Sequence, residues 1–402
     1  MLKHIEKLTN KIQNYAWGSH TAIPELMNKK PVSDMPQAEL WLGANPKASS
    51  EIIINGKHKA IIKIIEKSPE DILGEKTAAK FNNRLPYLFK ILAAAKPLSI
   101  QAHPNKTMAV KGYDLENKNR IPIDAHNRNY KDNNHKPELV CALTPFWALN
   151  GFRKIKDIIR LLEQINYKGL NKYNVLKKEQ NFQAFKHFFN ELMTMQPVLQ
   201  KNIMEQAVKS AKNLLNDNII FEWIVKLNDE YPLDVGVLSP ILLNLIYLKP
   251  EQAMFLHAGT LHAYLDGTCI ELMANSDNVL RGGLTPKYVD VPELLKNLNF
   301  NAQDVEIILP KESNIKYEKI YKTDADEFIL SVITLKNGDR YASPVKRSAE
   351  IIICTNGKVE IFEEQLEKKK IIQKGESVII PAMVKKYYIN GDATLYKAGV
   401  PI

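Results

Sequence analysis

The chain has 402 residues, of which 45% are hydrophobic and 25% charged, an ordinary globular mix that excludes a disordered or fibrous protein. No apolar run comes near the ~20 residues that a membrane-spanning helix needs, and the first residues lack the long apolar stretch of a secretory signal. Three widely separated cysteines, Cys141, Cys269 and Cys354, argue against a disulfide framework and against a thiolate zinc site. We therefore expect a soluble, cytoplasmic protein without a membrane partner.

The charges sum to +10, from 55 Lys and Arg against 45 Asp and Glu. A basic surplus can attract nucleic acid or any other anionic ligand. Here the lysines are spread along the whole chain, so we expect no nucleic-acid partner. The charge is compatible with a phosphorylated small-molecule substrate but does not by itself indicate one.

Residues 1–150 have the pattern of strands joined by turns, and Asn55-Gly56 between two isoleucine-rich runs is typical of a hairpin. From Lys154 to about Asp234 glycine is scarce and apolar residues recur at helical spacing, which predicts several amphipathic helices. Strand patterns then resume.

The last hundred residues carry three further Asn-Gly pairs at 337–338, 356–357 and 390–391, each next to β-branched or aromatic residues. We expect a turn at each of them. The predicted order along the chain is therefore a β unit, a helical insertion, the rest of that β unit, and a second β unit.

The segment 97–104 alternates strictly, with Ser99, Gln101 and His103 on one face of the predicted strand. This face is either a solvated polar surface or the lining of a ligand or metal site inside a β-barrel. In the segment 133–140, Lys136 and Glu138 share a face of the extended chain and His135 points away. Glu138 is then either a metal ligand beside a cation or half of a surface ion pair.

In the segment 257–271, Asp266-Gly267 suits a two-residue hairpin turn, which would place His262 directly opposite Glu271. His257 would point to the other side of the strand. Taken together, Gln101, His103, Glu138 and His262 supply two nitrogens and two oxygens, a set that suits a divalent first-row ion such as zinc. No histidine follows His262, so we expect the last β unit to bind no metal.

Two cations flank a glycine pair in the segment 275–287. Arg281 precedes Gly282-Gly283 and Lys287 follows, and either cation could bind a phosphate or belong to a solvated surface turn. Neither a P-loop nor a G-x-G-x-x-G motif occurs, so these types of nucleotide site are not supported.

Six motifs closely resemble those of the type I mannose-6-phosphate isomerases, in the same order and over nearly the whole chain. They are Asn14-Tyr15-Ala16-Trp17-Gly18, residues 38–43, residues 98–106, residues 134–138, residues 262–265, and residues 274–281. The resemblance implies a mainly β fold with an α-helical insertion, built from two cupin-type (jelly-roll) β-barrels plus a helical domain. It implies a zinc-binding catalytic domain of residues 1–152 and 236–300, a helical insert of residues 153–235, and a degenerate, metal-free cupin-like domain of residues 301–402.

The resemblance also assigns roles to the residues singled out above. Gln101, His103, Glu138 and His262 match the ligands of one Zn²⁺ per chain, and Arg281 matches the catalytic arginine. The family's pocket is lined at the positions of Ser99, Lys136, Tyr264, Glu271 and Lys287.

The implied reaction interconverts mannose 6-phosphate and fructose 6-phosphate through a cis-enediol intermediate, in carbohydrate metabolism and on the route to GDP-mannose. We expect Glu271 or Lys136 to be the proton-transfer base, and Lys136, Lys287 and Ser99 to bind the phosphate and hydroxyls. We expect a monomer. Two alternatives remain: a non-catalytic cupin that binds a sugar phosphate, and an iron-dependent cupin dioxygenase, which usually has more imidazole ligands.

Overall fold

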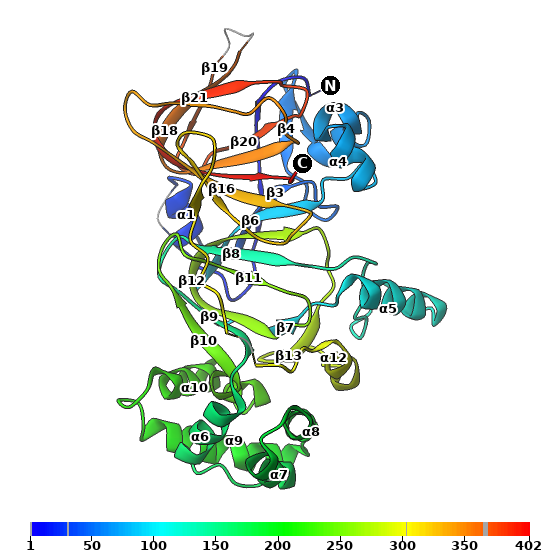
Figure 1. Ribbon diagram of the computed structural model, residues 1–402, viewed down its shortest axis with the longest axis vertical. Helices are drawn as coiled ribbons and strands as arrows, with labels where there is room; N and C mark the ends of the chain where they lie inside the picture. The colour runs from blue at the N-terminus through cyan, green and yellow to red at the C-terminus, as the bar shows by residue number, and fades with distance from the viewer. Residues whose placement is uncertain (1, 30–31, 303, 365–368) are drawn as a thin grey trace.

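The computed structural model describes residues 2–29, 32–302, 304–364 and 369–402. The molecule is elongated, with a helical block at one end, a ten-stranded sheet in the middle and a nine-stranded sheet at the other end (Figure 1). This is the predicted mainly β architecture with a helical insertion, and both sheets curl as cupin-type units.

The ten-stranded sheet contains β2 (Lys11–Gln13), β3 (Glu39–Gly43), β6 (Tyr87–Ala94), β7 (Ile100–Ala102), β8 (Glu138–Ala142), β9 (Phe146–Phe152), β10 (Leu243–Leu248), β11 (Ala253–Leu256), β12 (His262–Ala274) and β13 (Leu280–Gly283). Strand β12 is its hub, because it pairs antiparallel with β6, β7, β8 and β9. Alternate residues of these strands face the inside of the barrel, as Leu92 and Val140 do, while their neighbours Ile91 and Leu139 face the nine-stranded sheet.

The predicted hairpin at Asp266-Gly267 is wrong, because β12 continues through this pair as one strand of 13 residues. Gly267 has a φ of 112°, and a Cβ added to it would lie 2.4 Å from the carbonyl oxygen of Pro145. The glycine therefore lets the strand bend close to a neighbouring chain segment instead of reversing it. As a result His262 pairs with Gln101 and Asn150, and Glu271 pairs with Lys90 and Val140, so the two side chains are not cross-strand partners.

The nine-stranded sheet contains β1 (Glu6–Lys7), β14 (Lys311–Glu312), β15 (Glu318–Tyr321), β16 (Ile329–Leu335), β17 (Arg340–Ala342), β18 (Glu350–Glu363), β19 (Lys369–Gln373), β20 (Ser377–Ile380) and β21 (Tyr387–Gly399). The N-terminal strand β1 joins this otherwise C-terminal sheet by pairing with β20. The two ends of the chain are thereby brought to the same end of the molecule (Figure 1).

Of the four Asn-Gly pairs predicted to form turns, two do so and two do not. Asn55-Gly56 joins β4 (Glu51–Ile54) to β5 (Lys57–Ala60) as the predicted hairpin, and Asn337-Gly338 forms a turn. The pairs at 356–357 and 390–391 are not turns, because they lie inside the long paired strands β18 and β21. At Gly357 a Cβ would lie 2.0 Å from the carbonyl oxygen of Asp392, so glycine serves a close crossing of two strands there.

Five helices form the helical block, in the region where the sequence shows helical spacing. They are α6 (Ile155–Gln164), α7 (Asn171–Glu179), α8 (Phe182–Met193), α9 (Pro197–Lys212) and α10 (Ile219–Glu230). The remaining helices are α1 (Ala22–Leu26), α2 (Ile61–Ile65), α3 (Pro69–Leu73), α4 (Glu75–Lys80), α5 (Lys106–Lys118), the 3-10 turn η1 (Val235–Leu238), α11 (Ser239–Leu242) and α12 (Val291–Asn297). The block packs against the barrel through one continuous apolar core that includes Phe152, Phe185 and Phe300.

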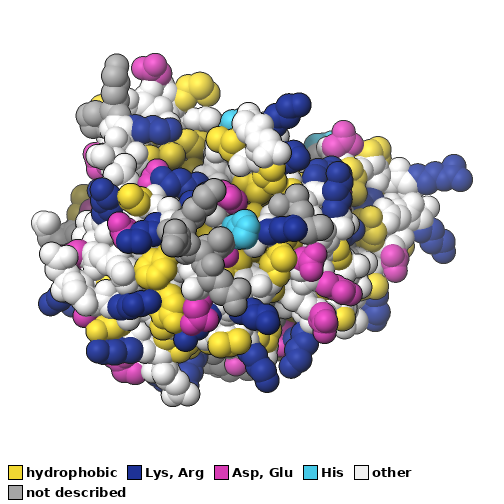
Figure 2. Space-filling model, turned by 90° about the horizontal axis from the view of Figure 1, so that it is seen from above, with side chains coloured by type: hydrophobic (Ala, Val, Ile, Leu, Met, Phe, Trp, Pro, Cys, Tyr) yellow, Lys and Arg dark blue, Asp and Glu magenta, His cyan; other side chains and the backbone are white. Residues whose placement is uncertain are grey.

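On the face shown in Figure 2, Lys and Arg side chains are interspersed with acidic and hydrophobic ones and do not gather into one patch. Among the residues that the structure describes, no helix has both the length and the apolar character needed to cross a bilayer.

Candidate active site

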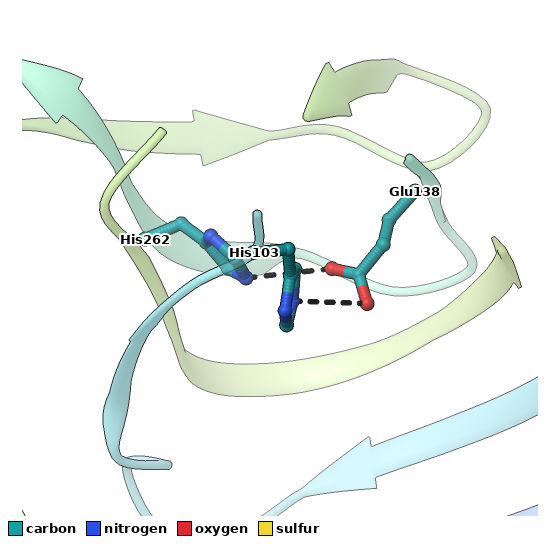
Figure 3. A group of neighbouring side chains, drawn as sticks. All are labelled: His103, Glu138 and His262. Atoms are coloured by element: carbon teal, nitrogen blue, oxygen red, sulfur yellow. Dashed lines mark ion pairs between the residues drawn. The ribbon is translucent and has the colours of Figure 1, made fainter. Parts of the chain in front are cut away.

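Three buried side chains from three strands converge inside the ten-stranded barrel. Glu138 begins β8, His262 begins β12 and His103 directly follows β7, and they are 1%, 4% and 2% exposed. His103 Nε2 lies 3.4 Å from Glu138 Oε1, and His262 Nε2 lies 3.4 Å from Glu138 Oε2. Figure 3 shows both imidazole rings directed at the one carboxylate. One potential ligand atom from each residue lies within 4.8 Å of the other two.

Backbone carbonyls orient both rings from behind. His103 Nδ1 lies 2.7 Å from the carbonyl oxygen of Asn278, and His262 Nδ1 lies 2.9 Å from that of Thr260. A carbonyl accepts hydrogen bonds and cannot donate, so each Nδ1 carries a proton and each ring turns its Nε2 toward Glu138. His103 Nε2 has no hydrogen-bond partner although it is buried. Two ring nitrogens directed at one carboxylate suit a cation site, and carbonyl-held imidazoles are typical metal ligands.

The electrostatics of the site favour the states that bind metals. Burial, assisted by the charge of Lys136, lowers the pKa of His103 to about 4, which keeps this ring neutral at pH 7. Burial alone would raise the pKa of Glu138, but Lys136 and His103 outweigh it and hold that pKa well below its ordinary value. A neutral imidazole and an ionised carboxylate are the forms in which these groups coordinate a metal.

Gln101 is the cross-strand partner of His262 in the β7–β12 pairing, so both side chains lie on the same face. Its Nε2 donates to Ser99 Oγ at 3.2 Å, which leaves the amide oxygen free to act as a ligand. The polar alternation of this strand therefore lines a site and is not a solvated surface.

A cavity of about 60 Å³ opens beside these groups. It is lined by polar residues from several strands, with apolar residues between them: Glu39, Lys90, Leu92, Leu98, Ser99, Gln101, Lys136, Glu138, His262, Ala263, Tyr264 and Glu271. Lys136 Nζ lies 2.8 Å from Glu138 Oε1, and the Tyr264 hydroxyl donates to Glu138 Oε2 at 3.2 Å. The ion pair predicted from strand parity is thus present, but it is buried.

Sequence reasoning missed Lys90 and Glu39, which also line this cavity. Lys90 Nζ donates to Glu271 Oε2 at 2.6 Å and lies 3.5 Å from Glu39 Oε1. Burial alone would lower the pKa of Lys90, but Glu271 and Glu39 raise it overall, so this lysine stays charged. One signal was present: Lys90 is the sole charged residue in the apolar run 87–94, and a buried charge needs a partner.

The two predicted cations of the glycine loop lie outside the cavity lining. Arg281, in β13, is directly opposite Gln101 in the β7–β13 pairing, so its side chain shares the face that borders the site. Lys287 is exposed, and Arg281 and Lys131 are half-buried. Burial lowers the pKa of Lys131, and the positive charges of Lys47, Arg281 and Lys287 lower it further. His135 points away from the site, as predicted, and its Nε2 lies 2.5 Å from Glu327 Oε1.

Comparisons with known proteins agree with this geometry. A family model described as the catalytic domain of type I phosphomannose isomerase matches residues 5–155. The chain is 42% identical to the mannose-6-phosphate isomerase of Salmonella typhimurium over 94% of this chain and 95% of that protein. It is 33% identical to that of Homo sapiens over 92% of each chain.

Solved structures agree as well. A crystal structure of a phosphomannose isomerase variant from Salmonella typhimurium has a TM-score of 0.92 and 39% identity, covering 99% of this chain and 100% of that one. A zinc-bound crystal structure of mannose 6-phosphate isomerase has a TM-score of 0.91, with the same identity and coverage. The chain belongs to the type I phosphomannose isomerase family.

Proposed function

We propose that this protein is a zinc-dependent aldose–ketose isomerase that interconverts mannose 6-phosphate and fructose 6-phosphate through a cis-enediol. The observation that carries the proposal is the pair of imidazoles, each held at Nδ1 by a backbone carbonyl, with both Nε2 atoms 3.4 Å from the Glu138 carboxylate. The similarity to named mannose-6-phosphate isomerases over more than 90% of the chain supports the choice of substrate.

His103, Glu138, His262 and Gln101 would hold one zinc ion. Bound there, zinc supplies a Lewis acid for the oxygen on which negative charge develops, worth several kcal/mol. The charge of Lys136 and the hydroxyl of Tyr264 keep the Glu138 carboxylate oriented toward the two rings. Burial raises the pKa of Tyr264 well above its ordinary value, so this hydroxyl remains a hydrogen-bond donor throughout the working pH range.

We assign the proton transfer between C2 and C1 to Glu271, with Lys136 as the alternative base. Both residues line the cavity, but Lys136 is paired with a proposed metal ligand, at 2.8 Å from Glu138 Oε1, whereas Glu271 is paired with Lys90, which is not a proposed ligand. Lys90 fixes the orientation of the Glu271 carboxylate, as a catalytic base requires. Arg281 would stabilise the charge that develops on the substrate oxygens.

The substrate phosphate would bind on the side of Arg281, with Lys287, Ser99 and Lys136 dividing the phosphate and hydroxyl contacts among them. Lys131 adds a cation that the sequence did not indicate; its pKa is lowered first by burial and then by neighbouring cations that include Arg281 and Lys287. A site of several cations favours a doubly charged phosphate over a neutral sugar.

We further propose that residues 1–152 and 236–300 form the zinc-binding catalytic domain, residues 153–235 a helical insert, and residues 301–402 a metal-free β domain. In this proposal the enzyme is a cytoplasmic monomer with a small-molecule substrate and no nucleic-acid partner. Its product is mannose 6-phosphate for GDP-mannose synthesis or fructose 6-phosphate for mannose catabolism.

The test combines metal analysis of the purified protein with a coupled assay for fructose 6-phosphate. We expect one zinc per chain and turnover of mannose 6-phosphate. Zinc and substrate binding without turnover would favour the non-catalytic sugar-phosphate-binding cupin. Iron with oxygen consumption would favour the dioxygenase.

The base assignment is tested by Glu271→Gln, which keeps the shape of the side chain but cannot accept the proton. We expect kcat to fall by about 10²–10⁴-fold with zinc content unchanged. Glu39→Gln is the matched control, because Glu39 flanks the same lysine on its other side. Near wild-type kcat in Glu271→Gln would transfer the assignment to Lys136.

A further inference from the structure

The loop that follows Arg281 is fastened to the end of the helical block by one carboxylate. Asp234 Oδ1 accepts the backbone N–H of Gly236 at 2.7 Å and that of Leu284 at 2.8 Å. Asp234 Oδ2 accepts the N–H of Thr285 at 3.4 Å. A single side chain thus ties residues 50 positions apart in the chain.

The backbone on both sides of this contact is held in an unfavourable conformation. Leu233 has a φ of 63° and Leu284 a φ of 50°, in the left-handed region that a residue with a branched side chain rarely adopts. The fit is close, because a Cβ added to Gly236 would lie 2.8 Å from both Leu284 N and Leu284 Cγ. A strained conformation persists only where its surroundings hold it, and the Asp234 hydrogen bonds supply that constraint.

Packing behind the loop is close. The apolar gap between the helical block and the barrel is only about 10 Å³, and Ile100 and Gly282, the chain neighbours of Gln101 and Arg281, line it. Apolar contacts and the hydrogen bonds to Asp234 therefore act together on this loop, and only the hydrogen bonds fix the direction of its backbone N–H groups.

The same end of the helical block also contacts the segment that leads into β7, the strand that pairs with β13. The Tyr231 hydroxyl donates to the carbonyl oxygen of Pro97 at 2.7 Å, and Glu230 pairs with Lys96 at 2.9 Å. Pro97 lies two residues before Ser99. The segment 230–236 therefore contacts both the residues that precede Ser99 and the loop that follows Arg281.

We propose that Asp234 is a positioning residue for the reaction, which holds the loop 282–287 so that Arg281 and Lys287 face the substrate. This inference rests on the proposed function for its substrate but concerns a residue that makes no contact with it. In this proposal the residues at the end of the helical block contribute to the reaction, because they set the distance between the loop 282–287 and the metal ligands.

The test compares Asp234→Ala and Asp234→Asn by kinetics and by amide hydrogen exchange of the zinc-loaded protein. In Asp234→Ala we expect faster exchange in residues 280–287, and kcat/KM for mannose 6-phosphate lower by about 10–100-fold, as a displacement near 1 Å would cause. Zinc content should stay at one per chain. Asp234→Asn keeps one oxygen in place of Oδ1, so its kcat/KM should remain within about 3-fold of the wild type, with faster exchange at Thr285 alone.

Asn218→Ala is the matched control, because it removes a side-chain acceptor for a backbone N–H (3.0 Å, from Ile220) at the other end of α10. It should lower the melting temperature without changing kcat/KM. Slow exchange in residues 280–287 and wild-type kcat/KM in Asp234→Ala would overturn the inference, as would an equal kinetic loss in Asn218→Ala. If Asp234→Ala does not fold, unchanged exchange at Thr285 in Asp234→Asn overturns it. If the wild-type protein shows no turnover, the proposed function is wrong. The hydrogen-exchange data then test separately whether Asp234 holds the loop 282–287.

Discussion

Each of the two sheets buries a lysine between two glutamates, and the surroundings of these two trios differ. In the ten-stranded sheet Lys90 lies between Glu271 and Glu39, and all three side chains line the cavity beside the metal-ligand candidates. In the nine-stranded sheet Lys397 Nζ lies 2.9 Å from Glu318 Oε1 and 3.2 Å from Glu350 Oε1.

Tyrosines close the second trio. The Tyr341 hydroxyl donates to Glu318 Oε2 and the Tyr387 hydroxyl to Glu350 Oε2, both at 2.8 Å. Lys397 also donates to Tyr341 at 3.0 Å, so its three N–H groups and both carboxylates are satisfied. The second trio is thus enclosed by further protein partners, whereas the first borders a cavity, and this difference fits a structural role for the second trio and the proposed role in the reaction for the first.

The largest effect should follow from His262→Ala. This substitution removes one of the two imidazoles that face Glu138 inside the ten-stranded sheet. We expect loss of zinc together with a fall in kcat/KM of about 10³-fold or more, because the Lewis acid contributes several kcal/mol. His257→Ala is the control, since His257 is exposed and stacks edge-on against Phe255 nearby. Full zinc occupancy in His262→Ala would exclude this ring from the metal site.

Strand parity alone placed Gln101 and His103 on one face and turned His135 away from Glu138. Parity is local and follows from backbone geometry, so a sequence can predict it. The hairpin at Asp266-Gly267 failed for a tertiary reason: a glycine with positive φ serves a turn or a bend equally well, and the approach of the Pro145 carbonyl decides between them. The close contact between Gly267 and Pro145 depends on the tertiary fold, so it cannot be predicted from the local sequence.

The apolar run 87–94 marks Lys90 as a buried charge but does not name its partners, and no local pattern marks Asp234. The partners of Lys90 are Glu271 and Glu39, which come from other strands. Asp234 binds backbone N–H groups of residues 284 and 285, and such partners carry no side-chain signature in a sequence.

The second test sets Lys90→Met against Lys397→Met. In Lys397→Met two sealed glutamates lose their counter-charge, so we expect the free energy of unfolding to fall by about 3–5 kcal/mol while kcat and zinc content stay unchanged in the folded fraction. In Lys90→Met the two glutamates border the cavity, where their side chains can reorient, so we expect a smaller loss of stability and a fall in kcat. Urea unfolding and the coupled assay measure the two quantities. Equal effects of the two substitutions on both quantities would show that the sealed and open trios do not differ in function.

The smallest effect concerns pH in the protein stripped of metal by a chelator. The pKa of His103 is lowered by burial to about 4, whereas an unfolded histidine titrates near 6.5. The unfolded chain therefore binds a proton in this window that the folded chain rejects, so stability is complete above pH 6.5 and falls as the pH drops toward 4, by about 2–3 kcal/mol. Glu138 acts below this window, because its depressed pKa costs stability only as the pH falls below its unfolded value near 4.3. His103 directly follows β7 and its ring adjoins that of His262 at the start of β12, so hydrogen exchange at pH 5 should accelerate in β7 and β12 but not in β21, which contains no histidine. His103→Gln should flatten the pH dependence of urea unfolding between pH 4 and 6.5, and an unaltered slope in that variant would assign the effect to another group.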